Sequence, residues 1–253
     1  MIARALRRRA AQPLLAPQAP AGRRVYAVGD VHGRADLLDL LLAKIDADGE
    51  GRTDKPFLVF VGDYIDRGRY SRQTIERLIG LSPDKYDLVF LRGNHEAEML
   101  NFLERPELGA RWLRIGGRET LESYKVPAPA YEATPAQMVE AAAALRAVLP
   151  AAHKAFLETL KMSAQLGDYV FVHAGLRPGR DLEKQTAEDM LEIREPFLNS
   201  KARFPFVVVH GHSPVENGFS DERRIAVDTG AYATGKLSAV RLEGAAVAFI
   251  EAT

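Results

Sequence analysis

Residues 57–68 read FLVFVGDYIDRG, an apolar run that ends in a glycine and an acidic loop. The same arrangement occurs upstream in VYAVGDVHG (25–33) and downstream in DLVFLRGNHE (87–96). Each apolar run is typical of a buried strand, and each polar end is typical of a loop. Leucines at helical spacing in 35–47, and a helix that Ser71 is expected to cap, separate these runs. The alternation predicts parallel strands joined by crossover helices.

The second half of the chain has a different pattern. Alanine-rich periodic runs broken by prolines predict a helical cap of several short helices over about 97–162. One further helix is expected over 186–199. Six strand-like runs are expected to form a second, mixed sheet: 163–166, 169–173, 206–210, 224–228, 237–242 and 246–251. The sequence therefore predicts an α/β fold, a four-layer α/β/β/α sandwich with a helical cap insertion, as one domain over 24–253.

The composition excludes several functional classes. The 34 basic and 34 acidic residues balance, so no overall field would attract the chain to nucleic acid or to an anionic membrane, and neither is an expected partner. The absence of cysteine excludes disulfides, thiolate metal sites and a cysteine nucleophile, and is compatible with the cytoplasmic location that we expect. No apolar run has the length of a membrane span.

The first 23 residues are rich in alanine, proline and arginine and contain no acidic residue. They lack the long apolar stretch of a signal peptide. A disordered N-terminal arm over 1–23 is the favoured interpretation, and an organelle transit peptide is the alternative.

Five loops carry the polar residues that are suited to chemistry. They are GDVHG (29–33), GDYIDRG (62–68), GNHE (93–96), HAG (173–175) and HGHSP (210–214), and together they contain five of the six histidines. Ligands collect beyond the carboxyl ends of strands in open α/β sheets, so we expect these loops to meet at one edge. Aspartate, asparagine and histidine form a donor set for Mn, Fe, Zn or a similar divalent ion, and an aspartate between two ions can bridge them.

The ordered set GDxHG, GDxxDRG and GNHE, followed by later histidines, resembles the PPP-type metallophosphoesterases, in particular the bacterial and lambda-phage-like serine/threonine protein phosphatases. Supporting matches are GGRETLESY (116–124), LEIREPF (191–197) and DTGAYATGKLSAV (228–240). The resemblance covers about 24–240 and implies the calcineurin-like metallophosphoesterase fold. A single short motif is weak evidence, whereas the ordered set is specific.

The resemblance implies two divalent metal ions, with Mn expected and Fe, Zn or Mg as alternatives. It assigns to the first metal Asp30, His32 and Asp63. It assigns to the second metal Asp63, Asn94, His173 and His212. Asp63 would bridge the two ions.

The resemblance also implies catalytic and substrate-binding residues. His95 would protonate the leaving alkoxide and would be held by the carboxylate of Asp66. Arg67 and Arg194 would bind the phosphoryl oxygens as planar forks. Arg92 would do the same or would support its loop.

Several of these residues also have an ordinary structural alternative. A D-x-H pair can be a strand-end turn with a hydrogen-bonded histidine, and Asp66 with Arg67 can be an internal ion pair. Arg194 could pair only with Glu192 or Glu195.

The motifs assign no role in the site to four other residues. His210 is expected to be a core or supporting histidine, and His153 a solvated helix residue. Asp228 could orient a ligand histidine or close a turn. Trp112 is expected in the core of the helical cap.

These patterns leave several functions to compare. The first is a metal-dependent phosphomonoester hydrolase, a serine/threonine protein phosphatase whose substrate is a phosphoprotein or a small phosphate ester. The second is a symmetrical dinucleoside tetraphosphate hydrolase. A non-catalytic metal-binding regulatory protein is disfavoured because every expected ligand and the general acid are present. A nuclease is disfavoured by the neutral charge and by an acid–base pair suited to monoesters.

Overall fold

The computed structural model describes residues 16–130 and 132–253 of the chain. The three strands predicted ahead of the acidic loops lie side by side and parallel: β1 (Arg24–Val28), β2 (Phe57–Phe60) and β3 (Asp87–Phe90). Their crossover helices are α1 (Ala35–Asp48) and α2 (Ser71–Ile79). The shared direction of the strands places the loops that follow them at one edge of the sheet.

The last two strands complete this first sheet. β9 (Leu237–Glu243) runs antiparallel to β1 and β10 (Ala246–Ala252) pairs with β9, so the order is β10-β9-β1-β2-β3. The prediction that both strands belong to the second sheet is therefore wrong. β9 is buried along most of its length. Its pattern fits either sheet, because local sequence does not encode which strand it pairs with.

The second sheet has the order β4-β5-β6-β8-β7 and is mixed, as predicted. Its strands are β4 (Ser163–Leu166), β5 (Tyr169–Val172), β6 (Val207–His210), β7 (Phe219–Ser220) and β8 (Arg224–Ala226). β5, β6 and β8 are parallel, whereas β4 and β7 run antiparallel to their neighbours. Parallel neighbours again bring the loops after β5 and β6 to a common edge.

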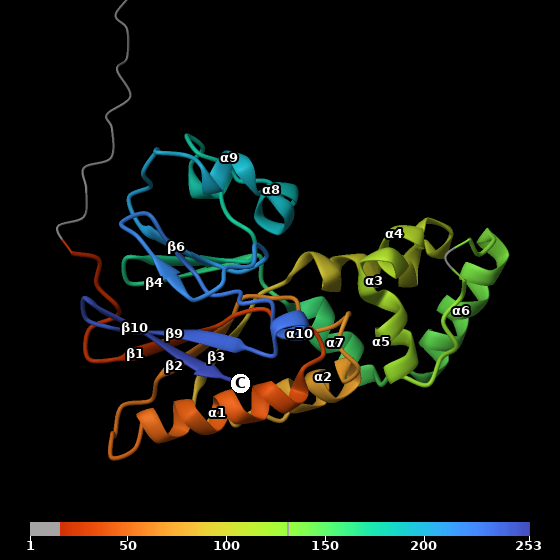
Figure 1. The fold of residues 1–253 in the computed structure, drawn as a ribbon, viewed down its shortest axis with the longest axis horizontal. Helices are drawn as coiled ribbons and strands as arrows, with labels where there is room; N and C mark the ends of the chain where they lie inside the picture. Colours follow the sequence, from red (N-terminus) through yellow and green to blue (C-terminus); the bar gives the residue numbers. More distant parts are fainter. Residues whose placement is uncertain (1–15, 131) are drawn as a thin grey trace, which may run out of the picture.

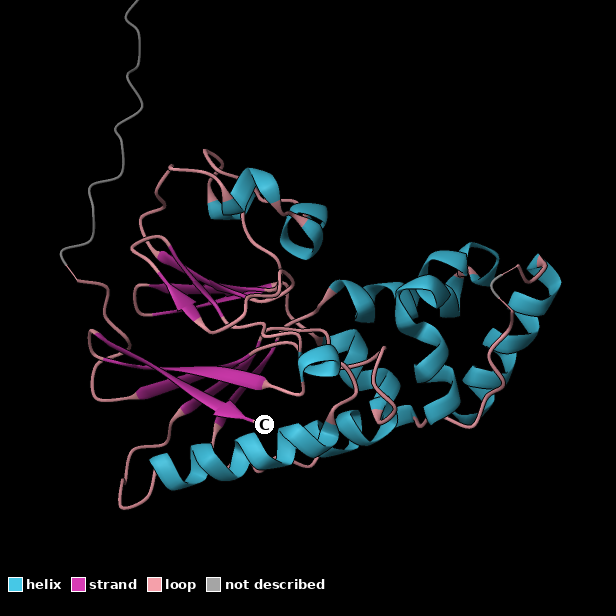
Figure 2. Cartoon of the chain, viewed as in Figure 1, coloured by secondary structure: helices cyan, strands magenta, loops and turns pink. Residues whose placement is uncertain are grey.

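The two sheets face each other and are covered by helices on their outer sides (Figure 2). Val59 and Val61 of the first sheet pack with Phe171 and Val209 of the second in one apolar cluster. The leucines of α1 cover the outer face of the first sheet. α8 (Ala187–Glu192) and α9 (Glu195–Leu198) cover the outer face of the second. This arrangement is the predicted four-layer sandwich.

The helical cap extends to one side of the sandwich (Figure 1). Its elements are α3 (Asn94–Glu104), η1 (Pro106–Leu108), α4 (Ala110–Trp112), η2 (Leu113–Gly117), α5 (Arg118–Ser123), α6 (Pro135–Val148) and α7 (Ala151–Thr159). Thr134 and Gln137 cap the start of α6. Apolar side chains of the cap join the cluster that lies under α1 and α2. Two short elements elsewhere are η3 (Leu182–Lys184) and α10 (Ala231–Thr234).

The single helix expected over 186–199 is divided into α8 and α9. Ile193 and Arg194 have non-helical backbone angles between the two helices. A continuous helix would bring the ring of Pro196 against the carbonyl of Glu192 and would leave that carbonyl without its donor. The interruption places Arg194 at the wall of a cavity beside the acidic loops.

The boundary expected for the N-terminal arm is also different. The backbone N–H of Gln18 donates to Asp168 Oδ2 at 2.9 Å, and that of Ala19 donates to the carbonyl of Gly244 at 2.8 Å. Ala19 is buried. Residues 16–23 therefore pack on the turns of the β4–β5 and β9–β10 hairpins. The rest of the proposed arm, 1–15, lies outside the described residues.

His153 is buried rather than solvated. Its Nδ1 lies 2.8 Å from the hydroxyl of Tyr124, so the ring joins α7 to the end of α5. Burial lowers the pKa of His153, which keeps the ring neutral. In the described part of the chain, no helix is both long and apolar enough to cross a membrane.

Replacing Phe171 by alanine tests the packing between the sheets. Phe171 is fully buried in the inter-sheet cluster, so Phe171→Ala should lower the free energy of unfolding by about 3–5 kcal/mol in urea titrations. Phe219 in the same sheet is 39% exposed, and Phe219→Ala should cost less than about 1 kcal/mol. Equal losses from the two variants would contradict this account of the core.

Candidate metal centre and active site

The predicted ligand residues meet where the carboxyl ends of the two sheets approach each other, and Asp63 lies at their centre. Asp63 Oδ2 is 3.4 Å from His173 Nε2, 3.5 Å from His32 Nε2 and 3.7 Å from His95 Nε2. Asp63 and His32 follow strands of the first sheet, whereas His173 follows a strand of the second. One carboxylate therefore lies between imidazoles that the two sheets supply.

The remaining predicted ligands complete the cluster. His173 Nε2 lies 3.0 Å from Asn94 Oδ1 and 3.2 Å from His212 Nδ1. Asp30 Oδ2 accepts the backbone N–H of His212 at 3.0 Å, so the loop after β1 contacts the loop after β6. All of these side chains except His212 are fully buried or nearly so.

Hydrogen bonds orient two of the imidazoles toward Asp63. His32 Nδ1 lies 2.9 Å from the carbonyl of Ile65, and His173 Nδ1 lies 2.9 Å from the carbonyl of Val61. A carbonyl can only accept, so each Nδ1 carries a proton, and each Nε2 points toward Asp63, where it could coordinate a cation. Burial lowers the pKa of His32 to about 3, so this ring is neutral, as a metal ligand must be.

The charges of this cluster fit divalent cations. Asp30 Oδ1 is buried and has no hydrogen-bond partner among the described residues. Burial, followed by the charges of Asp228 and Asp63, raises the pKa of Asp30 well above its usual range. Burial also raises the pKa of Asp228, to about 6. Buried carboxylates that repel one another need positive charge nearby, and oxygen with imidazole donors suits borderline divalent ions.

His95 has two possible roles in this arrangement. Ligand atoms of His32, Asp63 and His95 lie within 4.8 Å of one another, and so do those of Asp63, His173 and His212. The geometry alone would allow His95 to coordinate a metal in place of Asp30. A metal-ligating imidazole also commonly donates its other N–H to a carboxylate, so the hydrogen bond of His95 with Asp66, described below, fits both roles.

Several of these residues have a strained backbone. His32, Asp63 and His212 have φ angles of 44°, 52° and 62°, in the left-handed region that side chains with a Cβ avoid. Gly62 has φ 107°, and a Cβ on it would lie 2.6 Å from the backbone nitrogen of Gly93. Such strain is held in place by the surrounding structure and is concentrated at functional sites.

Glu96 holds the strained loops together, a role that we did not predict. Its carboxylate accepts the backbone N–H groups of Asp63 at 2.9 Å, Tyr64 at 2.7 Å and Gly93 at 2.9 Å. Burial, with the charge of Asp63, raises the pKa of Glu96 to about 7. The available signal was its position in GNHE, where an acidic side chain in the first turn of a helix can reach back to free N–H groups.

Asp66 is held by a buried network that reaches into the cap. Its Oδ2 lies 2.7 Å from His95 Nδ1 and accepts the indole N–H of Trp112 at 2.9 Å. Its Oδ1 accepts the hydroxyl of Thr120 at 2.5 Å. Trp112 lies in the core of the cap, as predicted, but this hydrogen bond was not foreseen.

Ser71 is not the cap of α2, because the helix begins at Ser71 and its Oγ accepts the N–H of Asp66 at 3.0 Å.

The environment of His95 favours its protonated form. Burial acts to lower the pKa of His95, but the charge of Asp63 and the hydrogen bond with Asp66 outweigh it and raise the pKa to about 9. The Nε2 atom lies on the side of the ring opposite Asp66, 3.5 Å from Arg67 Nη2. His95 can therefore carry a proton to a group bound beside Asp63.

A cavity of about 250 Å³ opens over this cluster. Two of the three arginines predicted to bind substrate line it, Arg67 and Arg194. Arg67 Nε donates to the carbonyl of Ile115 at 3.3 Å, and its guanidinium lies 4.6 Å from the ring centroid of Tyr232. Arg194 Nη1 donates to Ser213 Oγ at 3.2 Å. Among the described residues, Arg67 forms no ion pair with Asp66, and Arg194 forms none with Glu192 or Glu195.

Arg92 does not line this cavity. Its guanidinium donates to the carbonyl of Glu158 at 3.1 Å, near the end of α7. This contact favours the alternative that Arg92 supports its loop over the expectation that it binds substrate. His210 is buried, with Nδ1 2.9 Å from the carbonyl of Gly211, as expected of a core histidine. Asp228 Oδ1 accepts the N–H of Gly230 at 2.8 Å and so closes a turn at the cavity wall.

Four cavity residues were not singled out from the sequence: Arg111, Ile115, Glu192 and Tyr232. They lie outside the five loops and reach the cavity from α4, η2, α8 and α10. Glu192 and Tyr232 lie in the matched stretches 191–197 and 228–240, but no pattern in the sequence assigned any of the four to the cavity, because their position depends on how the cap and α8 are placed around the ends of the strands.

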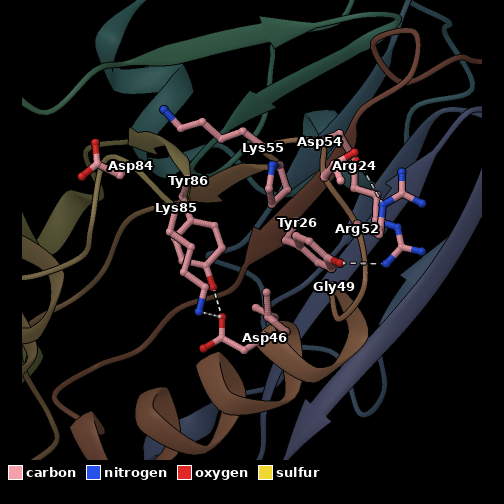
Figure 3. Close-up of a pocket in the computed structure, with 13 residues that line it drawn as sticks. Arg24, Tyr26, Asp46, Gly49, Arg52, Asp54, Lys55, Asp84, Lys85 and Tyr86 are labelled. Atoms are coloured by element: carbon pink, nitrogen blue, oxygen red, sulfur yellow. Dashed lines mark hydrogen bonds and ion pairs between the residues drawn. The ribbon is translucent and has the colours of Figure 1, made fainter.

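A second cavity, of about 260 Å³, lies at the opposite ends of β1–β3 (Figure 3). Its cationic side chains are already paired within the protein: Arg24 with Asp48 and Glu243, Arg52 with Asp54 and Glu243, Lys55 with Asp87, and Lys85 with Asp46. An anionic ligand would have to displace these carboxylates from the cationic side chains. The cavity over Asp63 is therefore the stronger candidate for an active site.

The four-layer sandwich and the Asp/His/Asn cluster between its sheets define a metal-dependent hydrolase of phosphate esters. The profile of the calcineurin-like phosphoesterases matches residues 23–243 of the chain. The chain belongs to this family, and it is a metallophosphoesterase. The match begins at Arg23, within the segment that packs on the two hairpins.

Relatives with assigned activities differ in substrate. The chain is 27% identical over 236 residues to bis(5'-nucleosyl)-tetraphosphatase PrpE [asymmetrical] of Geobacillus sp. (strain WCH70), which covers 85% of this chain and 88% of that protein. It is 36% identical over 77 residues to serine/threonine-protein phosphatase BSL2 of Arabidopsis thaliana, covering 30% of this chain and only 8% of that protein. A crystal structure described as a putative diadenosine tetraphosphatase superposes with a TM-score of 0.62 at 19% identity, covering 96% of this chain and 97% of that chain.

Substitution of Asp66 by asparagine should change the pH dependence of hydrolysis. A general acid must be protonated, so activity on an alkyl phosphate ester should fall as the pH rises through the pKa of His95. Asp66 raises that pKa, and its loss should move this basic limb to lower pH. The measurement is kcat/KM across pH 6–10 for both proteins at equal metal content. An unchanged basic limb would exclude His95–Asp66 as the acid.

Proposed function

We propose that this chain is a phosphomonoester hydrolase that acts on phosphoserine and phosphothreonine in proteins and uses a dinuclear metal centre. The observation that carries the proposal is His95, with Nδ1 held by Asp66 and Nε2 turned toward Asp63 and Arg67. The alkoxide of serine or threonine is a strongly basic leaving group. Its departure is greatly assisted by a proton, which is what a buried, protonated imidazole supplies.

Each part of the site then has a task. Two divalent cations, when bound, would polarise the phosphoryl oxygens and activate a water for attack on phosphorus. Asp30 and His32 would hold one ion, Asn94, His173 and His212 the other, and Asp63 would be shared between them. We propose Mn²⁺ for both positions, with Fe, Zn or Mg as the alternatives to be tested.

The side chains around the ions would handle the phosphoryl group and the proton. Arg67 and Arg194 would bind phosphoryl oxygens with their planar guanidinium groups. His95 would transfer the proton on Nε2 to the leaving oxygen, while Asp66 holds the ring in position through Nδ1. The chain contains no cysteine, which is consistent with attack by water and without a thiol phosphoenzyme.

A dinucleoside tetraphosphate hydrolase is the second candidate. It is favoured by the two relatives that match nearly the whole chain, PrpE and the putative diadenosine tetraphosphatase. The leaving group in that reaction is a nucleotide phosphate, which departs without a proton, so His95 is less necessary to it. A regulatory protein without activity remains the alternative of another class, and it is disfavoured because the proposed ligands, two of the three expected arginines and His95 lie together at one cavity.

The variant His95→Asn distinguishes a general acid from a metal ligand. As an acid, His95 should be dispensable for metal binding, while its loss should lower kcat by about 10²–10⁴-fold on a phosphothreonine peptide. The loss should be much smaller on p-nitrophenyl phosphate, because p-nitrophenolate leaves unprotonated. Metal content by mass spectrometry is measured on the same samples. Loss of metal with equal loss of both activities would assign His95 to coordination.

A substrate panel decides between the two candidate functions. The metal-stripped protein is reconstituted with Mn²⁺, Zn²⁺, Fe²⁺ or Mg²⁺ and assayed on a phosphoserine peptide and on diadenosine tetraphosphate. We expect the higher kcat/KM on the phosphopeptide, with Mn²⁺ giving the highest rate. A strong preference for the dinucleotide would refute this, and its products would then show whether cleavage is symmetrical (two ADP) or asymmetrical (AMP and ATP).

A further inference from the structure

We propose that Arg111 and Glu192 form an ion-pair latch across the outer part of the active-site cavity. When it opens, Arg111 binds a phosphate on the leaving group, so the pair determines how well the site accepts polyphosphates relative to simple monoesters. This inference rests on the proposed function as a phosphoester hydrolase and concerns the substrate range of the same site.

The two residues reach the cavity from different parts of the fold. Arg111 lies in α4 of the helical cap, and Glu192 is the last residue of α8, which covers the second sheet. In Figure 1, α8 lies over the second sheet, α4 lies to its right in the cap, and α10 lies below both. Both side chains line the cavity over Asp63, and Arg111 Nη2 donates to the carboxylate of Glu192. The ion pair therefore joins the cap to the opposite wall.

Of the two ion pairs that Arg111 forms, the one with Glu98 is held more firmly and the one with Glu192 opens more easily. Arg111 Nε also lies 3.0 Å from Oε1 of Glu98, whose side chain is only 15% exposed. The side chains of Arg111 and Glu192 are 51% and 39% exposed. Water and salt screen an exposed ion pair, so it contributes little to stability and opens readily. Opening the contact with Glu192 leaves Arg111 attached to the cap through Glu98.

The charges on the two walls explain why opening would matter. Arg67 and Arg194 are available for the oxygens of one phosphoryl group. A leaving group that begins with another phosphate carries negative charge toward the outer wall, where Glu192 repels it and Arg111 attracts it. In the closed pair these effects cancel. An Arg111 released from Glu192 presents a planar fork of donors, which suits a phosphate.

The experiment compares inhibition by tripolyphosphate with inhibition by orthophosphate. The proteins are wild type, Glu192→Gln, Arg111→Gln and the double variant, assayed with p-nitrophenyl phosphate at a fixed excess of free Mn²⁺. Glu188→Gln, which removes an exposed carboxylate from the same helix outside the cavity wall, is the matched control. Chelation of Mn²⁺ by tripolyphosphate acts equally on all five proteins and cancels in the comparison.

We expect the affinity ratio of tripolyphosphate to orthophosphate to rise several-fold in Glu192→Gln and to fall about tenfold in Arg111→Gln, as for the loss of a charge-assisted hydrogen bond. The double variant should resemble Arg111→Gln, and Glu188→Gln should resemble wild type. An unchanged ratio in both single variants would overturn the proposal. So would a parallel loss of affinity for both anions with a lower Tm, which is what a merely structural ion pair predicts.

Calorimetric titration of the Mn²⁺-loaded proteins with tripolyphosphate measures the same differences without turnover. A protein that hydrolyses no phosphate ester would refute the proposed function. The latch would then still be decided by whether Glu192→Gln binds tripolyphosphate more tightly, and Arg111→Gln more weakly, than Glu188→Gln.

Discussion

The site depends on the burial of several carboxylates around Asp63. Asp30, Asp63, Glu96 and Asp228 are all nearly inaccessible to water, and ionised carboxylates are costly to bury without compensation. Glu96 is compensated by three backbone N–H groups, whereas Asp30 Oδ1 has no such partner in the described structure. The fold therefore concentrates negative charge at the ends of its strands, and cations placed among these carboxylates would relieve the repulsion. The same carboxylates hold the left-handed backbone of two residues, because Glu96 accepts the N–H of Asp63 and Asp30 accepts that of His212.

The two sheets contribute different parts of this arrangement. The first supplies Asp30, His32, Asp63 and Asn94 through three parallel strands, and the second supplies His173 and His212 through β5 and β6. Neither sheet alone has the complete ligand set. The inter-sheet cluster around Val59 and Phe171 therefore fixes the distances between ligands as well as the stability of the sandwich. The cap adds the support of Asp66 through Trp112 and Thr120, so the orientation of His95 depends on a third region of the chain.

The sequence predicted the position of a site residue where that residue directly follows a recognisable strand pattern. Asp30, Asp63 and Asn94 each follow an apolar run within a few residues, so their place at the end of a strand could be predicted, and the sandwich with it. Sequence was not informative where the outcome depended on distant partners. The pattern of β9 fits either sheet. His153 in α7 contacts Tyr124 at the end of α5, and Arg92 donates to a carbonyl of α7. The role of Trp112 likewise needs the folded cap, because 46 residues separate it from Asp66.

For the same reason, the sequence indicates the type of reaction more clearly than the substrate. The residues that would bind metal, phosphoryl group and proton lie close to Asp63, and a phosphomonoester and a phosphoanhydride present the same phosphoryl group to them. What differs between these substrates is the leaving group, and the cavity wall available to it includes Tyr232, Arg111 and Glu192. These side chains come from α10, the cap and α8, outside the five loops that carry the ligand residues. The five loops therefore indicate the family but not the leaving group, which is where a phosphomonoester and a phosphoanhydride differ.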